Sequence, residues 1–300
     1  MRFSTLFNLL VFKSVDFFFD FSQNGFSKKI DGIKELKNVI YVDDSTSKQQ
    51  SFDAYLHADE TIRPFIFYVH GGGFVAGDKK HRRRMCREAA KLGFNVFSIN
   101  HSLCPNTVFP GALKDLDEAM RFISARKDEY KIDLDKAVVG GDSSGGYWSC
   151  LYTTALSNPE VKEHYGIQYP GKFRYAFFNC GLYDLNTALN QKTLFNISLG
   201  LYNDIFGKKF DPNEVIDKYV SSVDFITEAF PKTFLIYAEK DYFCAGQAEK
   251  LIEKFNSVGV DFKEFHSTDK NNNHCFSLSY KKKLSKICNA KLDAFLKEIF

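Results

Sequence analysis

Short, unbroken runs of apolar residues, separated by stretches of helical periodicity, constrain the fold of this chain more than any other feature. Residues 65–69 and 233–238 are two such runs. A strand that is apolar on both faces is typical of a parallel sheet covered by helices. We therefore expect an α/β protein in which strand and helix alternate through right-handed crossovers.

Eight segments have the length and composition of strands. They lie at residues 39–42, 51–56, 64–69, 95–100, 136–140, 174–179, 233–238 and 260–265. Helical patterns occur at residues 83–91, 110–130, 144–156, 246–257 and 277–300. The alternation predicts a mostly parallel, eight-stranded sheet flanked by helices, with residues 1–300 forming a single domain.

Two segments fall outside this alternation. The N-terminal apolar stretch is interrupted by Lys13 and Asp16, and it lacks the long apolar core and small-residue cleavage site of a signal peptide. It predicts an amphipathic helix lying over the rest of the protein, or, less favoured, on a membrane surface. Residues 183–230 contain no convincing strand, which fits a lid or equally a helical excursion packed on one sheet edge.

Charge and cysteine content exclude several classes of protein. Lys and Arg number 40 against 37 Asp and Glu, and this near balance gives no electrostatic signature for nucleic acid. The basic run at residues 79–84 predicts the solvated face of a helix. Seven scattered cysteines without a C-x-x-C pair argue against a disulfide framework and a zinc site, and favour a reducing, cytoplasmic location. No apolar stretch reaches the length of a membrane-spanning helix.

The sharpest chemical signal is the segment Gly141-Asp142-Ser143-Ser144-Gly145, which has the pattern G-x-S-x-G between an expected strand and an expected helix. In this context the pattern predicts a nucleophile elbow, a tight turn that lifts a serine hydroxyl above the sheet. Glycines on both sides let neighbouring backbone approach without a Cβ in the way. Ser143 is therefore the expected nucleophile.

A second glycine-rich segment, His70-Gly71-Gly72-Gly73, follows the expected strand at residues 64–69. Acyl transfer places negative charge on a carbonyl oxygen, and backbone N–H groups stabilise that charge. We expect the N–H groups of Gly72, Gly73 and Ser144 to form such an oxyanion hole, with His70 bracing the loop. A phosphate-binding loop is disfavoured because no Lys-Ser or Lys-Thr pair follows.

A nucleophilic serine needs a base, and the base needs an orienting acid. In α/β-hydrolases these follow the serine in the order acid, then histidine. Asp241, just past a strand end, is the expected acid, with Glu239 as the second choice. His274, in a loop before the last helix, is preferred as the base over His266, which closes a strand.

Together these segments resemble the hormone-sensitive-lipase-like branch of α/β-hydrolases, from about residue 35 to the C-terminus. The resemblance implies an α/β-hydrolase fold, with residues 1–36 and about 183–230 forming a cap over the active site. Two departures stand out. That branch usually has Tyr-Arg-Leu-Ala-Pro where this chain has His-Ser-Leu-Cys-Pro at residues 101–105, and it usually has Ala where this chain has Ser144. Only the N–H of Ser144 is needed, so the second change should be harmless.

The sequence thus predicts a serine hydrolase that cleaves carboxylic esters through an acyl-enzyme on Ser143, without cofactor or metal. The expected partner is a small ester with an apolar acyl or alcohol group, with no nucleic acid and no membrane span; a homo-oligomer is also compatible with the sequence. An amidase or peptidase with the same triad stays open, as does a non-catalytic binding module on a hydrolase scaffold.

Overall fold

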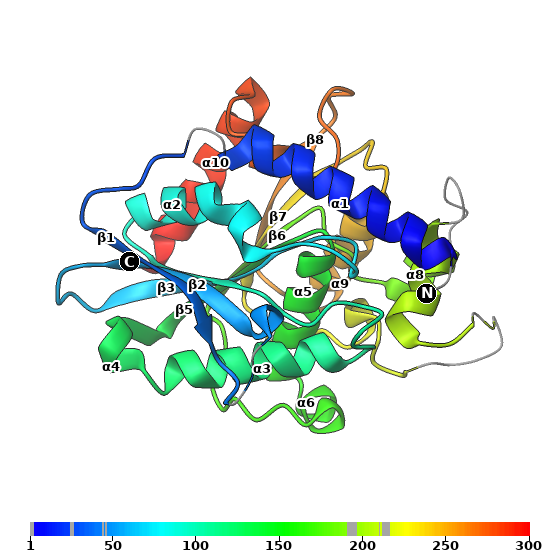
Figure 1. Cartoon of the computed structure of the whole chain (residues 1–300), viewed down its shortest axis with the longest axis horizontal. Helices are drawn as coiled ribbons and strands as arrows, with labels where there is room; N and C mark the ends of the chain where they lie inside the picture. The colour runs from blue at the N-terminus through cyan, green and yellow to red at the C-terminus, as the bar shows by residue number, and fades with distance from the viewer. Residues whose placement is uncertain are drawn as a thin grey trace.

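The computed structural model describes residues 3–24, 27–43, 45, 47–190, 197–209, 211 and 217–300. Within them, one twisted sheet of eight strands runs through the centre of the molecule in the order β1-β2-β4-β3-β5-β6-β7-β8 (Figure 1). The strands are β1 (Ile33–Ile40), β2 (Ser51–His57), β3 (Arg63–Val69), β4 (Asn95–Ile99), β5 (Ile132–Asp142), β6 (Tyr175–Asn179), β7 (Lys232–Ala238) and β8 (Phe262–Ser267).

The sheet is mostly parallel, as expected. Strand β2 pairs antiparallel with β1 and with β4, and the five pairings from β4 to β8 are parallel. The carboxyl ends of the parallel strands therefore meet at one edge of the sheet, where ligands bind in open α/β folds. The predicted α/β fold is confirmed.

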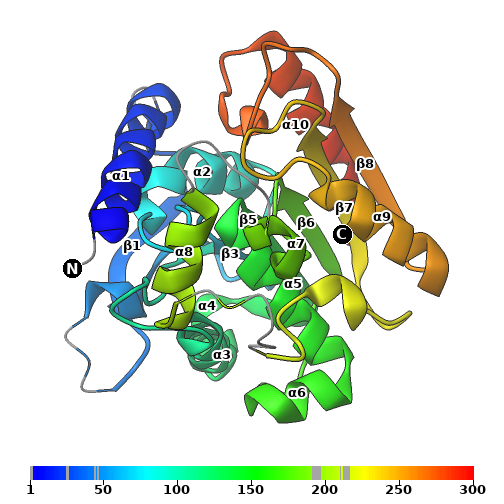
Figure 2. The same cartoon turned by 90° about the vertical axis from the view of Figure 1, so that its right-hand side faces the viewer.

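Helices cover both faces of the sheet (Figures 1 and 2). The α-helices are α1 (Phe3–Asn24), α2 (Arg83–Lys91), α3 (Gly111–Ser124), α4 (Lys127–Tyr130), α5 (Ser144–Ser157), α6 (Pro159–Tyr165), α7 (Leu185–Asn190), α8 (Ile197–Phe206), α9 (Gln247–Val258) and α10 (Lys283–Leu296). Alternate residues of β3 serve the two faces: Phe65 and Phe67 pack with residues of α3, α5 and α9, whereas Ile66 and Tyr68 pack with α2 and α10. Burial on both faces explains why this strand is an unbroken apolar run.

Four expected boundaries were wrong, one of them at β5, which begins at Ile132 rather than at residue 136. The first strand begins at Ile33 rather than residue 39, because β1 is a half-exposed edge strand without an apolar run. The expected helix 110–130 is two helices, separated where the Arg126 N–H bonds back to the Ile123 carbonyl and tightens the end of α3. The expected helix 277–300 begins at Lys283, because a turn and an extended Lys282 precede it.

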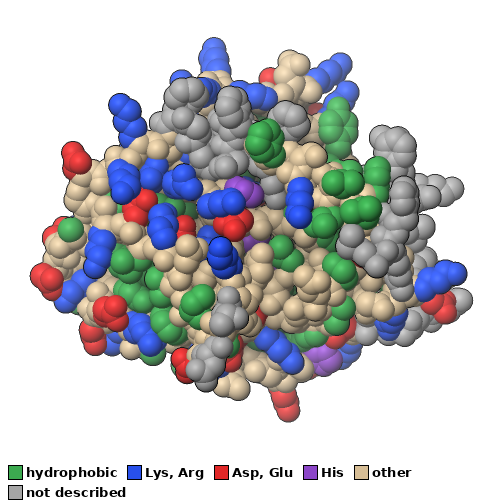
Figure 3. Space-filling view, in the orientation of Figure 1, with side chains coloured by type: hydrophobic (Ala, Val, Ile, Leu, Met, Phe, Trp, Pro, Cys, Tyr) green, Lys and Arg blue, Asp and Glu red, His purple; other side chains and the backbone are tan. Residues whose placement is uncertain are grey.

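The N-terminal segment forms the long helix α1, which lies across the top of the molecule beside α8 (Figures 1 and 2). Asp204 of α8 accepts hydrogen bonds from two buried side chains of α1, Thr5 Oγ1 at 2.5 Å and Asn8 Nδ2 at 3.3 Å. The outer face of α1 carries exposed Leu6 and Leu10, and hydrophobic side chains gather along this helix in Figure 3. Within the described residues, no helix combines the length and apolar character needed to cross a membrane. Residues 1–2, 25–26, 191–196, 210 and 212–216 of the two expected cap segments lie outside the description.

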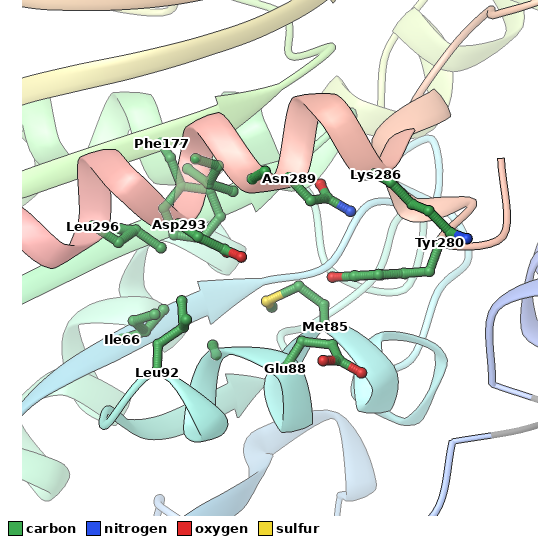
Figure 4. A pocket seen from close by; sticks show the side chains of 13 residues that line it. Ile66, Met85, Glu88, Leu92, Phe177, Tyr280, Lys286, Asn289, Asp293 and Leu296 are labelled. Carbon is green, nitrogen blue, oxygen red and sulfur yellow. The ribbon is translucent and has the colours of Figure 1, made fainter. Parts of the chain in front are cut away.

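A cavity of about 200 Å³ lies between α2 and α10, on the face of the sheet away from α3 and α5 (Figure 4). Its floor is apolar, and the polar ends of Tyr280 and Asp293 point into it. Burial raises the pKa of Asp293 to about 6, and the nearby charge of Glu88 acts in the same direction. None of the residues expected to take part in catalysis lines this cavity.

Candidate active site

Ser143 lies at the sharp turn between β5 and α5. Its backbone is in a rare conformation, with φ of 53° and ψ of −126°, and its N–H bonds to the carbonyl of Asn179 at the end of β6. The flanking glycines are required by close approach. A Cβ on Gly145 would lie 2.3 Å from the carbonyl oxygen of Val69, and one on Gly141 would lie 2.4 Å from that of Gly145. The segment therefore forms the strand–turn–helix expected of a nucleophile elbow.

The structure brings Ser143, His274 and Asp241 together in series. Ser143 Oγ lies 2.9 Å from His274 Nε2, and His274 Nδ1 lies 2.9 Å from both carboxylate oxygens of Asp241. A proton on Nδ1 would bond to the carboxylate and leave Nε2 free to accept from the serine. The two second choices lie elsewhere: Glu239 is exposed, and the ring of His266 stacks on Tyr237 with centroids 4.5 Å apart.

Backbone donors fix the carboxylate of Asp241. Its Oδ1 accepts from the N–H groups of Phe243 at 2.8 Å and Cys244 at 2.9 Å. Burial raises the pKa of Asp241, but the His274 imidazole and these donors outweigh burial and hold the pKa below its ordinary value. The carboxylate is therefore ionised at neutral pH, as an acid that orients a histidine must be.

Asn273 joins the loop that carries Asp241 to the loop that carries His274, a role that the sequence did not reveal. Its side-chain oxygen accepts from the N–H groups of His274 at 2.7 Å and Tyr242 at 3.2 Å, and its amide nitrogen donates to the carbonyl of Lys240. The long loop before His274 is thus fastened to the loop that carries Asp241. The run of three Asn residues at 271–273 was the only signal of such a contact.

The glycine-rich loop after β3 packs directly against the elbow. A Cβ on Gly71 would lie 2.8 Å from the Cβ of Ser143. Gly72 and Gly73 have φ of 149° and 61°, and the Gly72 carbonyl accepts from Ala76 N–H, which closes the loop. Within the described part of the chain, the N–H groups of Gly72, Gly73 and Ser144 have no acceptor. These three donors are free to receive a charged oxygen beside Ser143.

His70 sits beneath this loop and is fully buried. Its Nδ1 lies 2.8 Å from the Gly71 carbonyl oxygen, and its ring stacks on His101 with centroids 4.8 Å apart. Burial lowers the pKa of His70 to about 3, and the neighbouring His101 contributes to the shift. A neutral, stacked imidazole of this kind supports the loop and does not exchange protons near neutral pH.

The basic run at residues 79–84 was wrongly expected to be a solvated helix face. Arg82 is only 5% exposed and donates to Asp142, the residue before Ser143, through Nε at 2.7 Å and Nη2 at 2.5 Å. Tyr68 Oη also donates to this carboxylate, at 2.9 Å. Lys79 is buried as well and donates to Asn38. A buried carboxylate inside the elbow demands a cation, and the basic run supplies it.

Phe12 of α1 lies against the glycine-rich loop of the site. Its ring covers Gly73, because a Cβ there would lie 2.4 Å from the ring carbons. Phe12 also packs on Phe243, at 6.0 Å between ring centroids, and Phe243 packs on His274 at 5.0 Å. The N-terminal helix therefore contributes an apolar wall beside the glycine loop and the histidine.

Comparison with known proteins gives a consistent result. The BD-FAE family model matches residues 52–255, about two thirds of the chain. Esterase LipI of Mycobacterium tuberculosis is 36% identical over 90 residues, which cover 29% of this chain and 28% of LipI. An acetyl esterase of Salmonella schwarzengrund is 33% identical over 103 residues, 34% of this chain and 32% of that protein. The matched segments thus span less than a third of either relative.

Among solved structures, esterase B of Lactobacillus rhamnosis superposes with a TM-score of 0.85 at 18% identity, covering 98% of this chain and 95% of that one. This likeness shows the shared fold across almost the whole chain, including the N-terminal helix. The similarities confirm the resemblance to esterases of the hormone-sensitive-lipase-like α/β-hydrolase branch.

Proposed function

The chain belongs to the BD-FAE family, and we propose that it is a serine hydrolase that cleaves carboxylic esters. One observation carries the proposal: Ser143, His274 and Asp241 form an unbroken series of 2.9 Å contacts beside unoccupied N–H donors. Nucleophilic catalysis by serine needs these elements together. That the two curated relatives are named esterases supports the choice of substrate.

In the proposed mechanism, Ser143 Oγ attacks the carbonyl carbon of the ester while His274 Nε2 takes its proton. The carbonyl oxygen becomes an oxyanion and binds the N–H groups of Gly72, Gly73 and Ser144. Asp241 keeps the imidazole in the required tautomer and stabilises its positive charge. The tetrahedral intermediate collapses, His274 protonates the departing alcohol, and the acyl group stays on Ser143.

The second half of the cycle uses the same groups. Water enters in place of the alcohol, gives a proton to His274, and attacks the acyl-enzyme carbonyl. The oxyanion forms at the same donors, and the proton on His274 returns to Ser143 as the carboxylic acid leaves. This chemistry calls for no cofactor or metal ion.

We further propose that α1 and α8 act as the cap of the site within a single domain. The hydrogen bonds from Thr5 and Asn8 to Asp204 hold the two helices together, and Phe12 projects from α1 onto the glycine loop. The aromatic wall formed by Phe12 and Phe243 favours a small ester with an apolar acyl or alcohol group. A cytoplasmic location is consistent with the seven cysteines, all of which are free thiols.

The nucleophile is tested with Ser143→Ala and a short nitrophenyl ester. We expect kcat to fall by a factor on the order of 10⁴ or more, because serine, histidine and acid act as one unit. Ser157→Ala, at the far end of the same helix, is the matched control and should retain the wild-type rate. Wild-type turnover by Ser143→Ala would refute the mechanism.

Two measurements separate the alternatives. A fluorophosphonate probe should label wild-type protein at Ser143, and failure to label would favour a non-catalytic binding module. Comparing one acyl group on an ester and on an amide distinguishes an esterase from an amidase, because both reactions use the same triad.

A further inference from the structure

Three buried cysteines surround the Asp241–His274 pair. Cys180 directly follows β6, Cys244 lies in the loop between β7 and α9, and Cys275 directly follows His274. All three are free thiols and almost completely shielded from solvent. The proposed mechanism uses none of them.

The sulfur atoms lie within reach of the histidine. One sulfur each from Cys180 and Cys275 and a ring nitrogen of His274 lie within 4.8 Å of one another. A second set, made of an Asp241 carboxylate oxygen, the Cys244 sulfur and a His274 ring nitrogen, meets the same limit. His274 belongs to both sets, so it lies where the two groups of donor atoms meet.

The donor types fit a thiophilic cation. Two thiolates with an imidazole are ligands that Zn²⁺ and related cations prefer. In a tetrahedral zinc site with Zn–S bonds of about 2.3 Å, two sulfurs lie about 3.8 Å apart, so the two sulfurs must approach each other by at most about 1 Å. Binding replaces existing contacts: the 3.7 Å contact of the Cys275 sulfur with the Asn179 carbonyl oxygen, its contact with the Cys180 thiol, and one of the two ring-nitrogen contacts of His274.

We propose that Cys180, Cys275 and His274 form an inhibitory binding site for a thiophilic divalent cation, with Zn²⁺ as the leading candidate. Each thiol that coordinates the ion releases its proton to solvent, so no oxidant or reductant is needed. Asp241 is the nearest further donor, because it contacts both His274 and the Cys180 thiol. A metal-bound His274 no longer relays the proton of Ser143, and hydrolysis stops.

Binding is tested first, without reference to catalysis. Cd²⁺ is added to Ser143→Ala protein, which keeps every proposed ligand, and the ultraviolet charge-transfer band of cadmium–thiolate bonds is followed. We expect one Cd²⁺ per chain. Adding Cys180→Ser or Cys275→Ser should weaken binding at least about tenfold, since losing even an outer-shell partner typically costs ten- to a hundredfold.

Cys86→Ser is the matched control, because this cysteine is equally buried but lies in α2, outside both donor sets. It should bind Cd²⁺ as the parent does. An undiminished band in folded Cys180→Ser and Cys275→Ser proteins would overturn the site. Should those variants fail to fold, X-ray absorption of wild-type protein with one equivalent of Zn²⁺ decides: two sulfurs at about 2.3 Å support the site, and a shell of only nitrogen and oxygen overturns it.

The inhibitory role rests on the proposed hydrolysis and is measured separately. Zn²⁺ should suppress turnover of a nitrophenyl ester by wild-type protein, and a chelator should restore it. The ratio of the rates with and without Zn²⁺ should return towards one in Cys275→Ser but not in Cys86→Ser. Binding without inhibition would overturn the inhibitory role, whereas an inactive wild-type protein that still binds Cd²⁺ would count against the hydrolase alone.

Discussion

Replacing Arg82 by Met should expose how the nucleophile turn is stabilised. Asp142 is 1% exposed, and within the described residues Arg82 donates two hydrogen bonds to its carboxylate while Tyr68 donates one. Met keeps much of the side-chain volume but leaves a buried charge without its cation. Breaking a buried pair in this way typically costs about 3–5 kcal/mol. Because a whole domain is stable by only about 5–15 kcal/mol, the loss should be large in urea unfolding followed by circular dichroism at pH 7.

The pH dependence gives this prediction its sharpest test. In the wild type, burial raises the pKa of Asp142, but the Arg82 charge and the hydrogen bonds outweigh it and hold the pKa below its ordinary value. The Arg82–Asp142 pair therefore stabilises the wild type at pH values above the pKa that Asp142 has in the unfolded chain. This stability is lost as the pH falls through the pKa of Asp142 in the folded protein. Without Arg82, burial is the largest influence and is opposed mainly by the weaker hydrogen bond from Tyr68, so the pKa of Asp142 should rise. The variant is then most stable below the unfolded pKa and loses stability as pH rises. The difference in free energy of unfolding between the wild type and Arg82→Met should therefore become smaller as the pH is lowered from 7 to 4.5.

Two controls make the result decisive. Lys80→Met removes an exposed cation from the same turn and should change the free energy of unfolding by no more than about 0.5 kcal/mol. Asp142→Asn combined with Arg82→Met should cost less than the sum of the single changes, because neither charge is left unpaired. If Arg82→Met lowers the free energy of unfolding by less than about 1 kcal/mol, or if its difference from the wild type does not vary with pH, the Arg82–Asp142 pair does not stabilise the turn at Ser143.

Two further substitutions test other parts of the structure. Gly73→Ala should lower kcat on a nitrophenyl ester about a hundredfold. An alanine is strained at φ of 61°, and its Cβ would lie 2.4 Å from the Phe12 ring, so the loop must shift and carry the Gly73 N–H away from the oxyanion position. An unchanged kcat would exclude Gly73 from that role. Asp293→Asn should stabilise the protein at pH 7 by about 1 kcal/mol after allowance for solvent screening. The raised pKa of Asp293, about 6, means that the carboxyl group stabilises the fold below about pH 4 and that this contribution is lost as pH rises through 6; equal gains at pH 4 and pH 7 would contradict this reasoning.

The central strands and the order of elements could be predicted from the sequence. A strand that is buried on both faces carries apolar residues at successive positions, and such an unbroken run is easy to recognise. The interior strands β3 and β7 fall within a residue or two of their expected places. The edge strand β1 does not, since it is only half buried and carries Lys34, Glu35 and Lys37. Helix ends were also misjudged, because apolar periodicity continues past the turns that break the backbone bonding pattern.

Pairings between distant side chains were harder to predict than the placement of single residues. Arg82 and Asp142 are 60 positions apart, and nothing local distinguishes a lysine or arginine that will meet a buried carboxylate from one that will face water. The same holds for Thr5 and Asp204, which join α1 to α8 across 199 positions. Sequence pattern reports the average environment of a segment, whereas such a contact depends on where two segments finally meet.

The proposed triad and the cysteines show which of two sequence criteria locates clustered side chains more reliably. Ser143, Asp241 and His274 could be chosen from the sequence because each follows a strand, and parallel strands deliver their carboxyl ends to one edge of the sheet. The cysteines were judged by spacing along the chain, a test suited to ligands that lie on one short loop. Judged by strand ends instead, Cys180 directly follows β6, and Cys244 and Cys275 follow β7 and β8. The same topology that brings Ser143, Asp241 and His274 together therefore brings the three thiols close to them.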